Sequence, residues 1–152
     1  MFSRTKLQLF TASALTLALG ALAYGGGYWL EFGNPSASKD PAAKGAIAIV
    51  RAMGCGEPSK STLKATAEGL VEGERKSITL EVVALSTPGA FALKGTLPAE
   101  GKWVVSATGT YMGAKRGAVA AVTPAGFDRK SAKSIPHQPA RADIDAVLIA
   151  SR

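Results

Sequence analysis

The feature that most limits what this chain can fold into is an uncharged stretch near its N-terminus. Residues 1–6 form a short basic segment that contains Arg4 and Lys6, and no further charged residue occurs before Glu31. A basic start followed by a long apolar run is typical of an export segment. The sequence therefore predicts that everything downstream crosses a membrane, and that only the remaining chain, about 120 residues, is available to build a folded domain.

One interpretation of the stretch is a secretory signal that is removed. Residues 7–19 are its apolar core, and Ala21-Leu22-Ala23 is the small-x-small pattern at which such signals are cut. The mature chain then starts at Tyr24. On this interpretation the domain is released on the far side of the membrane.

The other interpretation is a retained anchor. Roughly 20 apolar residues cross a bilayer as a helix, so residues 7–30 are long enough to span it as one N-terminal apolar helix before the domain. Arg4 and Lys6 stay on the cytoplasmic side, as basic flanks do. Amphipathic aromatic side chains collect at the outer interface of a membrane. The residues predicted to lie there are Tyr24, Tyr28, Trp29 and Phe32.

Four segments are expected along the chain. Residues 1–30 are the signal anchor or signal peptide. Residues 31–45, which include the Pro-, Ser- and Ala-rich run NPSASKDPAAK, are a flexible linker. Residues 46–126 form the folded domain, and residues 127–152 are a basic loop followed by a C-terminal helix. The folded part is long enough for one modest core.

The body of the chain predicts an all-β domain. Ile78, Leu80 and Val82 alternate with polar residues at the period of two that a half-buried strand requires. Residues 102–111 alternate in the same way, with Trp103 on the apolar side and Ser106 on the other. The predicted strands are residues 46–50, 61–71, 77–82, 90–93, 102–111 and 117–122. Turn signals about every 8–12 residues favour an antiparallel sandwich or small barrel, and we expect an immunoglobulin-like sandwich.

A short helix is predicted at the C-terminus. Pro139-Ala140-Arg141 opens it, and Ile144, Val147 and Leu148 then fall at helical spacing on one face. We expect this helix to pack against the edge of the sandwich. The alternative is a free amphipathic helix that awaits a partner.

The charge pattern argues against nucleic-acid binding. The chain has 18 basic and 11 acidic residues and a net charge of +7, but the basic residues are spread out and form no concentrated face. A solvated basic surface, or attraction to anionic lipid or to an acidic partner, explains this balance. The one cysteine, Cys55, leaves no internal disulfide in an oxidising compartment, so the core alone must hold the fold.

No catalytic set is evident, and the protein is not expected to be an enzyme. The single histidine, His137, lies in a proline-flanked loop, and nothing in the sequence places it beside a nucleophile. The sharpest chemical hypothesis is a copper(I) site made of Met53, Cys55, Met112 and His137, because soft thiolate and thioether ligands select copper(I). The alternative is that both methionines fill gaps and the cysteine is a small buried residue.

One pattern resembles a known group of domains. Pro88-Gly89-Ala90-Phe91 is followed by residues 97–105 (LPAEGKWVV), which together give G-x-[FY] and then P-x-x-G-x-W. This resembles the envelope β-sandwich domains of the FixH and YtkA-like families. The resemblance implies an accessory role, linked for FixH to copper supply in respiratory oxidase assembly. The methionine-proline-methionine segment of YtkA-like domains is missing here. Transthyretin-like and carboxypeptidase-regulatory-like sandwiches have similar turns.

The sequence thus predicts a non-enzymatic binding or accessory module of the cell envelope, tethered to the outer face of the cytoplasmic membrane or free on the periplasmic side. Its expected partners are the membrane and an envelope protein, and nucleic acid is not expected among them. We expect no cofactor. The alternative is a copper-handling accessory protein for the assembly of respiratory complexes.

Overall fold

The computed structural model describes residues 27–123 and 126–151. Most of the predicted N-terminal helix, the predicted cleavage site after Ala23, and Tyr24 lie outside these residues. Among the described residues, no helix is long and apolar enough to cross a membrane.

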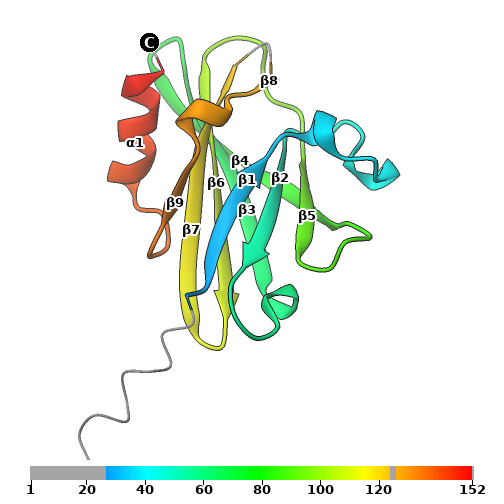
Figure 1. The fold of residues 1–152 in the computed structure, drawn as a ribbon. Coiled ribbons are helices and arrows are strands. Elements are labelled where there is room, and N and C mark those ends of the chain that lie inside the picture. The colour runs from blue at the N-terminus through cyan, green and yellow to red at the C-terminus, as the bar shows by residue number, and fades with distance from the viewer. Residues whose placement is uncertain (1–26, 124–125, 152) are drawn as a thin grey trace, which may run out of the picture.

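The described part of the chain is mostly β-structure with one short α-helix, as the sequence predicts (Figure 1). The strands are β1 (Trp29–Gly33), β2 (Ala48–Met53), β3 (Thr62–Val71), β4 (Glu74–Ala84), β5 (Ala90–Lys94), β6 (Lys102–Tyr111), β7 (Ala114–Thr123), β8 (Gly126–Phe127) and β9 (Lys133–Ile135). The helix α1 spans Arg141–Ala150, and short 3-10 turns occupy η1 (Pro35–Ala37), η2 (Pro41–Ala43), η3 (Pro58–Lys60) and η4 (Arg129–Ser131).

All strand pairs are antiparallel and follow the order β1-β2-β5-β4-β3-β6-β7-β8, with β9 also paired to β7. Strand β4 belongs to both halves of this sheet. Its first part pairs with β3, up to Leu80 opposite Ala65, and its last part pairs with β5, from Glu81 opposite Lys94. The sheet therefore curls, and β1 comes to lie against β7 and β9 from the other end of the strand order.

The main core fills the inside of the curl. Side chains from both halves of the sheet meet there, including Leu30 and Val50 from one half and Val105 and Ala107 from the other, all fully buried. Trp103 is the largest of them and is 3 % exposed. It packs directly over Gly69 of the neighbouring β3, where a Cβ would come within 2.5 Å of the indole. Glycine is therefore required opposite the tryptophan.

Two smaller cores cover parts of the outer surface. Helix α1 places Ile144, Val147 and Leu148 against the outward side chains of β6 and β7, among them Val104 and Val119. The predicted apolar face of the helix is thus confirmed. On the other side, η2 packs Ala43 against β2 and β5. Strands β6 and β7 are therefore buried on both faces.

The beginning of the domain differs from the prediction. Residues 28–33 were assigned to the export segment and the linker, but they form β1, which pairs with β2. Tyr28 and Leu30 point into the core, and Phe32 packs against it. Their alternation is that of a strand, which the continuous apolar run preceding them masked in the sequence. The expected linker is also structured, since η1 and η2 lie within it.

Two hairpins close with the same kind of turn at opposite ends of the sheet. Glu72-Gly73 joins β3 to β4, and Met112-Gly113 joins β6 to β7. All four residues have positive φ, 53° and 82° in the first turn and 47° and 78° in the second. A two-residue turn of this kind favours Asn, Asp or Gly at its first position. A larger side chain there costs on the order of 1 kcal/mol.

The linker region is held to the sheet by one carboxylate. Asp40 accepts hydrogen bonds at 2.6 Å from both the hydroxyl and the backbone N–H of Ser86, and it also caps η2 through the N–H of Ala42. These bonds, first of all the one from the Ser86 hydroxyl, hold the pKa of Asp40 below its usual value. A carboxylate with a lowered pKa stabilises the fold above its unfolded pKa, near 3.9, and loses that effect as the pH falls through the folded pKa.

We therefore expect Ser86→Ala to lower the urea midpoint at neutral pH by a small, constant amount, and the difference from wild type to shrink below about pH 4. Urea titrations of both chains from pH 3 to pH 7 measure this. Ser77→Ala, at an exposed position of β4, is the control and should follow the wild type throughout. A deficit that persists unchanged at pH 3 would contradict the role given to Asp40.

Candidate functional site

A groove on the outer face of the sheet has a volume of about 590 Å³. Its floor is formed by β3 and β6, and one wall is formed by residues 138–139 and the start of α1. Pro139 can approach this closely because Gly117 of β7 lies beneath it, where a Cβ would collide with the proline ring. The groove therefore exists because α1 covers β6 and β7 but leaves β3 open.

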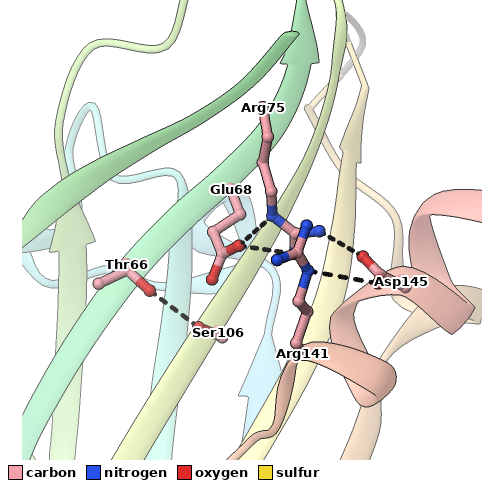
Figure 2. A network of polar contacts seen from close by, with 6 residues as sticks. All are labelled: Thr66, Glu68, Arg75, Ser106, Arg141 and Asp145. Atoms are coloured by element: carbon pink, nitrogen blue, oxygen red, sulfur yellow. Dashed lines mark hydrogen bonds and ion pairs between the residues drawn. The ribbon is translucent and has the colours of Figure 1, made fainter. Parts of the chain in front are cut away.

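Hydroxyl groups make up most of the floor. Thr62 of β3 pairs with Thr110 of β6, Thr66 pairs with Ser106, and Thr108 lies between them. Only Thr66 and Ser106 bond to each other, at 2.9 Å between their hydroxyl oxygens (Figure 2). Within the described residues, the hydroxyls of Thr62, Thr108 and Thr110 have no hydrogen-bond partner in the protein. They are available to a polar ligand.

Two lysines line the same groove. Lys64 pairs with Thr108 across β3 and β6, and Lys115 pairs with Thr110 across β6 and β7. Both are exposed, and neither forms an ion pair with any residue that the structure describes. This part of the groove therefore offers two cations beside a row of hydroxyls, an arrangement that complements a polar ligand with negative charge.

The other end of the groove is closed by an ion-pair network that joins three elements (Figure 2). Arg75 of β4 donates from Nε to Glu68 of β3 at 2.8 Å, and its Nη2 lies 2.7 Å from the same carboxylate oxygen without the alignment of a hydrogen bond. Its Nη1 donates to Asp145 of α1 at 2.5 Å, and Arg141 lies 3.9 Å from Asp145. The hydrogen bonds from Asp145 and then Glu68 raise the pKa of Arg75 further above its already high value. Glu68 is thus neutralised and adds little negative charge to the groove.

We expect Arg75→Met to loosen α1 from the sheet and to reduce the free energy of unfolding by about 1–2 kcal/mol, because Glu68 and Asp145 lose their shared partner while Glu68 stays largely covered. Hydrogen exchange of the amides in α1 should accelerate more than that of β6. Arg129→Met, at an exposed residue of η4, is the matched control and should change neither quantity. Unchanged exchange in α1 would show that the network does not hold the helix.

The four residues of the predicted copper site lie in two places. Met53 ends β2, Cys55 follows it in an exposed loop, and Met112 is at the tip of the β6–β7 hairpin, 88 % exposed. The loop touches this hairpin where Gly56 meets the hydroxyl of Tyr111. His137 instead lies near the groove, with its backbone carbonyl against Gly117, and its ring is exposed. No group of three or more His, Cys, Asp or Glu residues suited to a metal occurs in the described ranges.

Three of the four residues predicted to lie at the membrane interface are within the described part of the chain, and their surroundings differ. Tyr28 is 6 % exposed, with its ring 5.5 Å from that of Tyr111 and its hydroxyl over Gly109. Burial raises the pKa of Tyr28. Phe32 packs against Phe127. Tyr28 is a core residue and Phe32 is partly buried against the core, so most of each ring is covered by the domain itself. Trp29 is 37 % exposed and donates to Glu31 at 2.8 Å.

The chain matches no protein-family model, no curated protein and no solved structure.

Proposed function

We propose that this protein is a non-enzymatic binding module of the cell envelope, tethered to the outer face of the cytoplasmic membrane, whose groove holds an acidic segment of a protein partner. The observation that carries the proposal is the groove itself, in which hydroxyls and lysines without a partner among the described residues lie side by side. We also propose that the fold is of the immunoglobulin-like class expected from the sequence. This is supported by the two halves of the sheet, which enclose one core.

The chemistry of the groove favours an anionic and hydrogen-bonding partner. An acidic segment brings carboxylates to Lys64 and Lys115, and its backbone and polar side chains can bond to the threonine hydroxyls. Nucleic acid is a poorer candidate, because none of the described residues that line the groove is an aromatic on which bases could stack. An accessory role is also what the resemblance to FixH and YtkA-like domains implies.

The tether is supported by the sequence, in which the apolar run that ends at Ala23 is followed after a few residues by β1. With this anchor retained, the module stays beside membrane proteins of the envelope. Without Arg4 and Lys6, which stay on the cytoplasmic side, 16 basic and 11 acidic residues remain, and this net charge of +5 suits a partner with an acidic outer segment.

A labelled acidic peptide tests the groove. Full-length protein in detergent should bind a peptide of alternating Glu and Ser more tightly than a peptide of alternating Lys and Ser, and salt should weaken the binding. The double variant Lys64→Glu/Lys115→Glu should bind the acidic peptide at least about tenfold more weakly. Lys39→Glu/Lys44→Glu, which makes the same charge change at exposed residues outside the groove, is the control. Equal binding by the two double variants would overturn the proposal.

A copper-handling accessory protein is the second candidate. It is supported by Met53, Cys55 and Met112, which lie at the same end of the fold. Copper(I) titration of the full chain tests it, since Cys55→Ser should abolish tight binding if the thiolate is a ligand. Binding that survives Cys55→Ser, or that is absent in the wild type, would reject this candidate.

A further inference from the structure

The point at which the chain enters the domain defines one end of the fold. Figure 1 shows the start of β1 beside the β6–β7 hairpin. The loop after β2 is there too, because Gly54 lies against the backbone of Gly27 and Tyr28. We call this end, made of Trp29, residues 54–57 and residues 111–116, the tether end. Only residues 24–27 separate Ala23, the end of the apolar run, from Tyr28. At about 3.6 Å per residue, they allow at most roughly 18 Å between that run and the core.

Met112 is placed at the tether end in a way that the fold does not require. It occupies the first position of its turn with φ 47°, where Asn or Gly would fit better, and it is 88 % exposed, so it adds little to the packing of the domain. The equivalent position in the hairpin at the opposite end holds Glu72, with φ 53°. One turn thus presents a charged side chain to water, whereas the other presents a flexible apolar one at the end nearest the uncharged segment.

The charges around Met112 are mostly positive. Lys115 and Arg116 follow directly on β7, and Lys60 of η3 is paired at 2.7 Å with Glu57, the acidic residue of the same loop. That pair cancels, and Glu31, which accepts the hydrogen bond from the Trp29 indole, offsets one of the two remaining positive charges, so this end stays net positive by one charge. Trp29, one third exposed, adds an aromatic ring of the kind that collects at membrane interfaces.

We propose that the tether end docks on an anionic lipid surface, with Met112 inserted among the headgroups and Arg116 against their phosphates. Lys115, which also lines the groove, lies where the lipid and a partner in the groove meet, and it contributes to both contacts. This rests on the proposed function in one respect, namely that the uncharged segment is retained in the bilayer. Docking fixes the direction in which the module stands. The β3–β4 hairpin then points away from the membrane, and the groove runs up the side of the domain, where it faces neighbouring proteins of the same membrane.

Oxidation of methionine by dilute peroxide tests the docking on the native side chain. The full chain is reconstituted in vesicles of three parts phosphatidylcholine to one part phosphatidylglycerol, and sulfoxide formation at Met112 is followed by mass spectrometry of peptides. The reference is Glu72→Met, which places the same side chain in the same turn at the opposite end. Peroxide crosses bilayers, so the orientation of the chain in the vesicle does not matter. In the anionic vesicles we expect Met112 to oxidise at least about fivefold more slowly than the methionine introduced at position 72.

Reversing the charges of Lys115 and Arg116 measures how much of the protection of Met112 is electrostatic. Lys115→Glu/Arg116→Glu should restore fast oxidation of Met112, since each basic residue near an anionic surface is worth about a fivefold change in binding. Lys130→Glu/Lys133→Glu, with the same charge change outside the tether end, should leave Met112 protected. High salt, or vesicles of pure phosphatidylcholine, should likewise restore fast oxidation of Met112.

Flotation of the same vesicles distinguishes the two ways of failing. If the chain floats with the lipid but Met112 oxidises as fast as the methionine at position 72, the docking is overturned while the tether stands. If the chain does not float, the tether itself fails, and the docking fails with it. Protection of Met112 that does not change on reversal of Lys115 and Arg116 would reject the electrostatic part of the interface.

Discussion

Trp103→Ala should lower the free energy of unfolding by about 3–5 kcal/mol, a large part of the 5–15 kcal/mol that holds a domain of this size. The indole is 3 % exposed, and its ring lies on Gly69 of the adjacent strand. No neighbouring side chain can fill the space it leaves, because the position beneath it has no Cβ. Urea unfolding of the full chain in detergent, followed by circular dichroism, measures the loss.

The other described tryptophan is the control. Trp29 is 37 % exposed and lies on the first strand, so Trp29→Ala should cost clearly less than Trp103→Ala. A second variant checks the packing from the other side: Gly69→Ala should destabilise strongly, since its Cβ would meet the indole at 2.5 Å. Similar losses for Trp103→Ala and Trp29→Ala would contradict the position of Trp103 in the core.

Leu30→Ala should reduce the free energy of unfolding by about 2–5 kcal/mol. Leu30 is fully buried between the two halves of the sheet, and its methyl groups lie beside Gly109 of β6. Deleting them leaves a cavity at the place where β1 closes the curl. The same urea titration measures this loss.

This variant also decides between two assignments of residue 30. If the membrane span ended at Leu30, as the sequence alone suggested, the substitution would leave the stability of the domain unchanged. Leu70→Ala, at a position that is 42 % exposed on β3, is the matched control and should cost less than about 1 kcal/mol. Equal behaviour of the two leucine variants would place Leu30 outside the folded domain.

The strands that the sequence predicts correctly are those bounded by turns and marked by alternation. Residues 102–111 match β6 at both ends, and Ile78, Leu80 and Val82 do face the core. Strand β1 was missed because its apolar residues continue an uncharged run, so nothing in the sequence marks where the run ends and the strand begins. The short strands β8 and β9 carry too few residues for any periodicity to appear.

The groove could be predicted only in part. Ser106, Thr108 and Thr110 were already recognisable as the polar face of a strand, but the sequence does not say which strand lies beside it. The threonines of β3 lie beside this face because of the register in which β3 pairs with β6. The sequence does not fix that register, because β4 and β5 lie between the two strands along the chain and no hairpin joins them. The link from Arg75 to Asp145, 70 residues apart, likewise appears only once α1 has docked.

Strand β1 has a mechanical consequence. It is the first strand of the domain, it closes the curl, and Tyr28 at its start is buried beneath the β6–β7 hairpin. A pull applied at residue 27, with the rest of the domain held by a partner on the groove, acts along the length of β1. All the bonds between β1 and β2 are then loaded together rather than one after another. The domain should therefore resist extraction by force better than its thermodynamic stability alone would suggest.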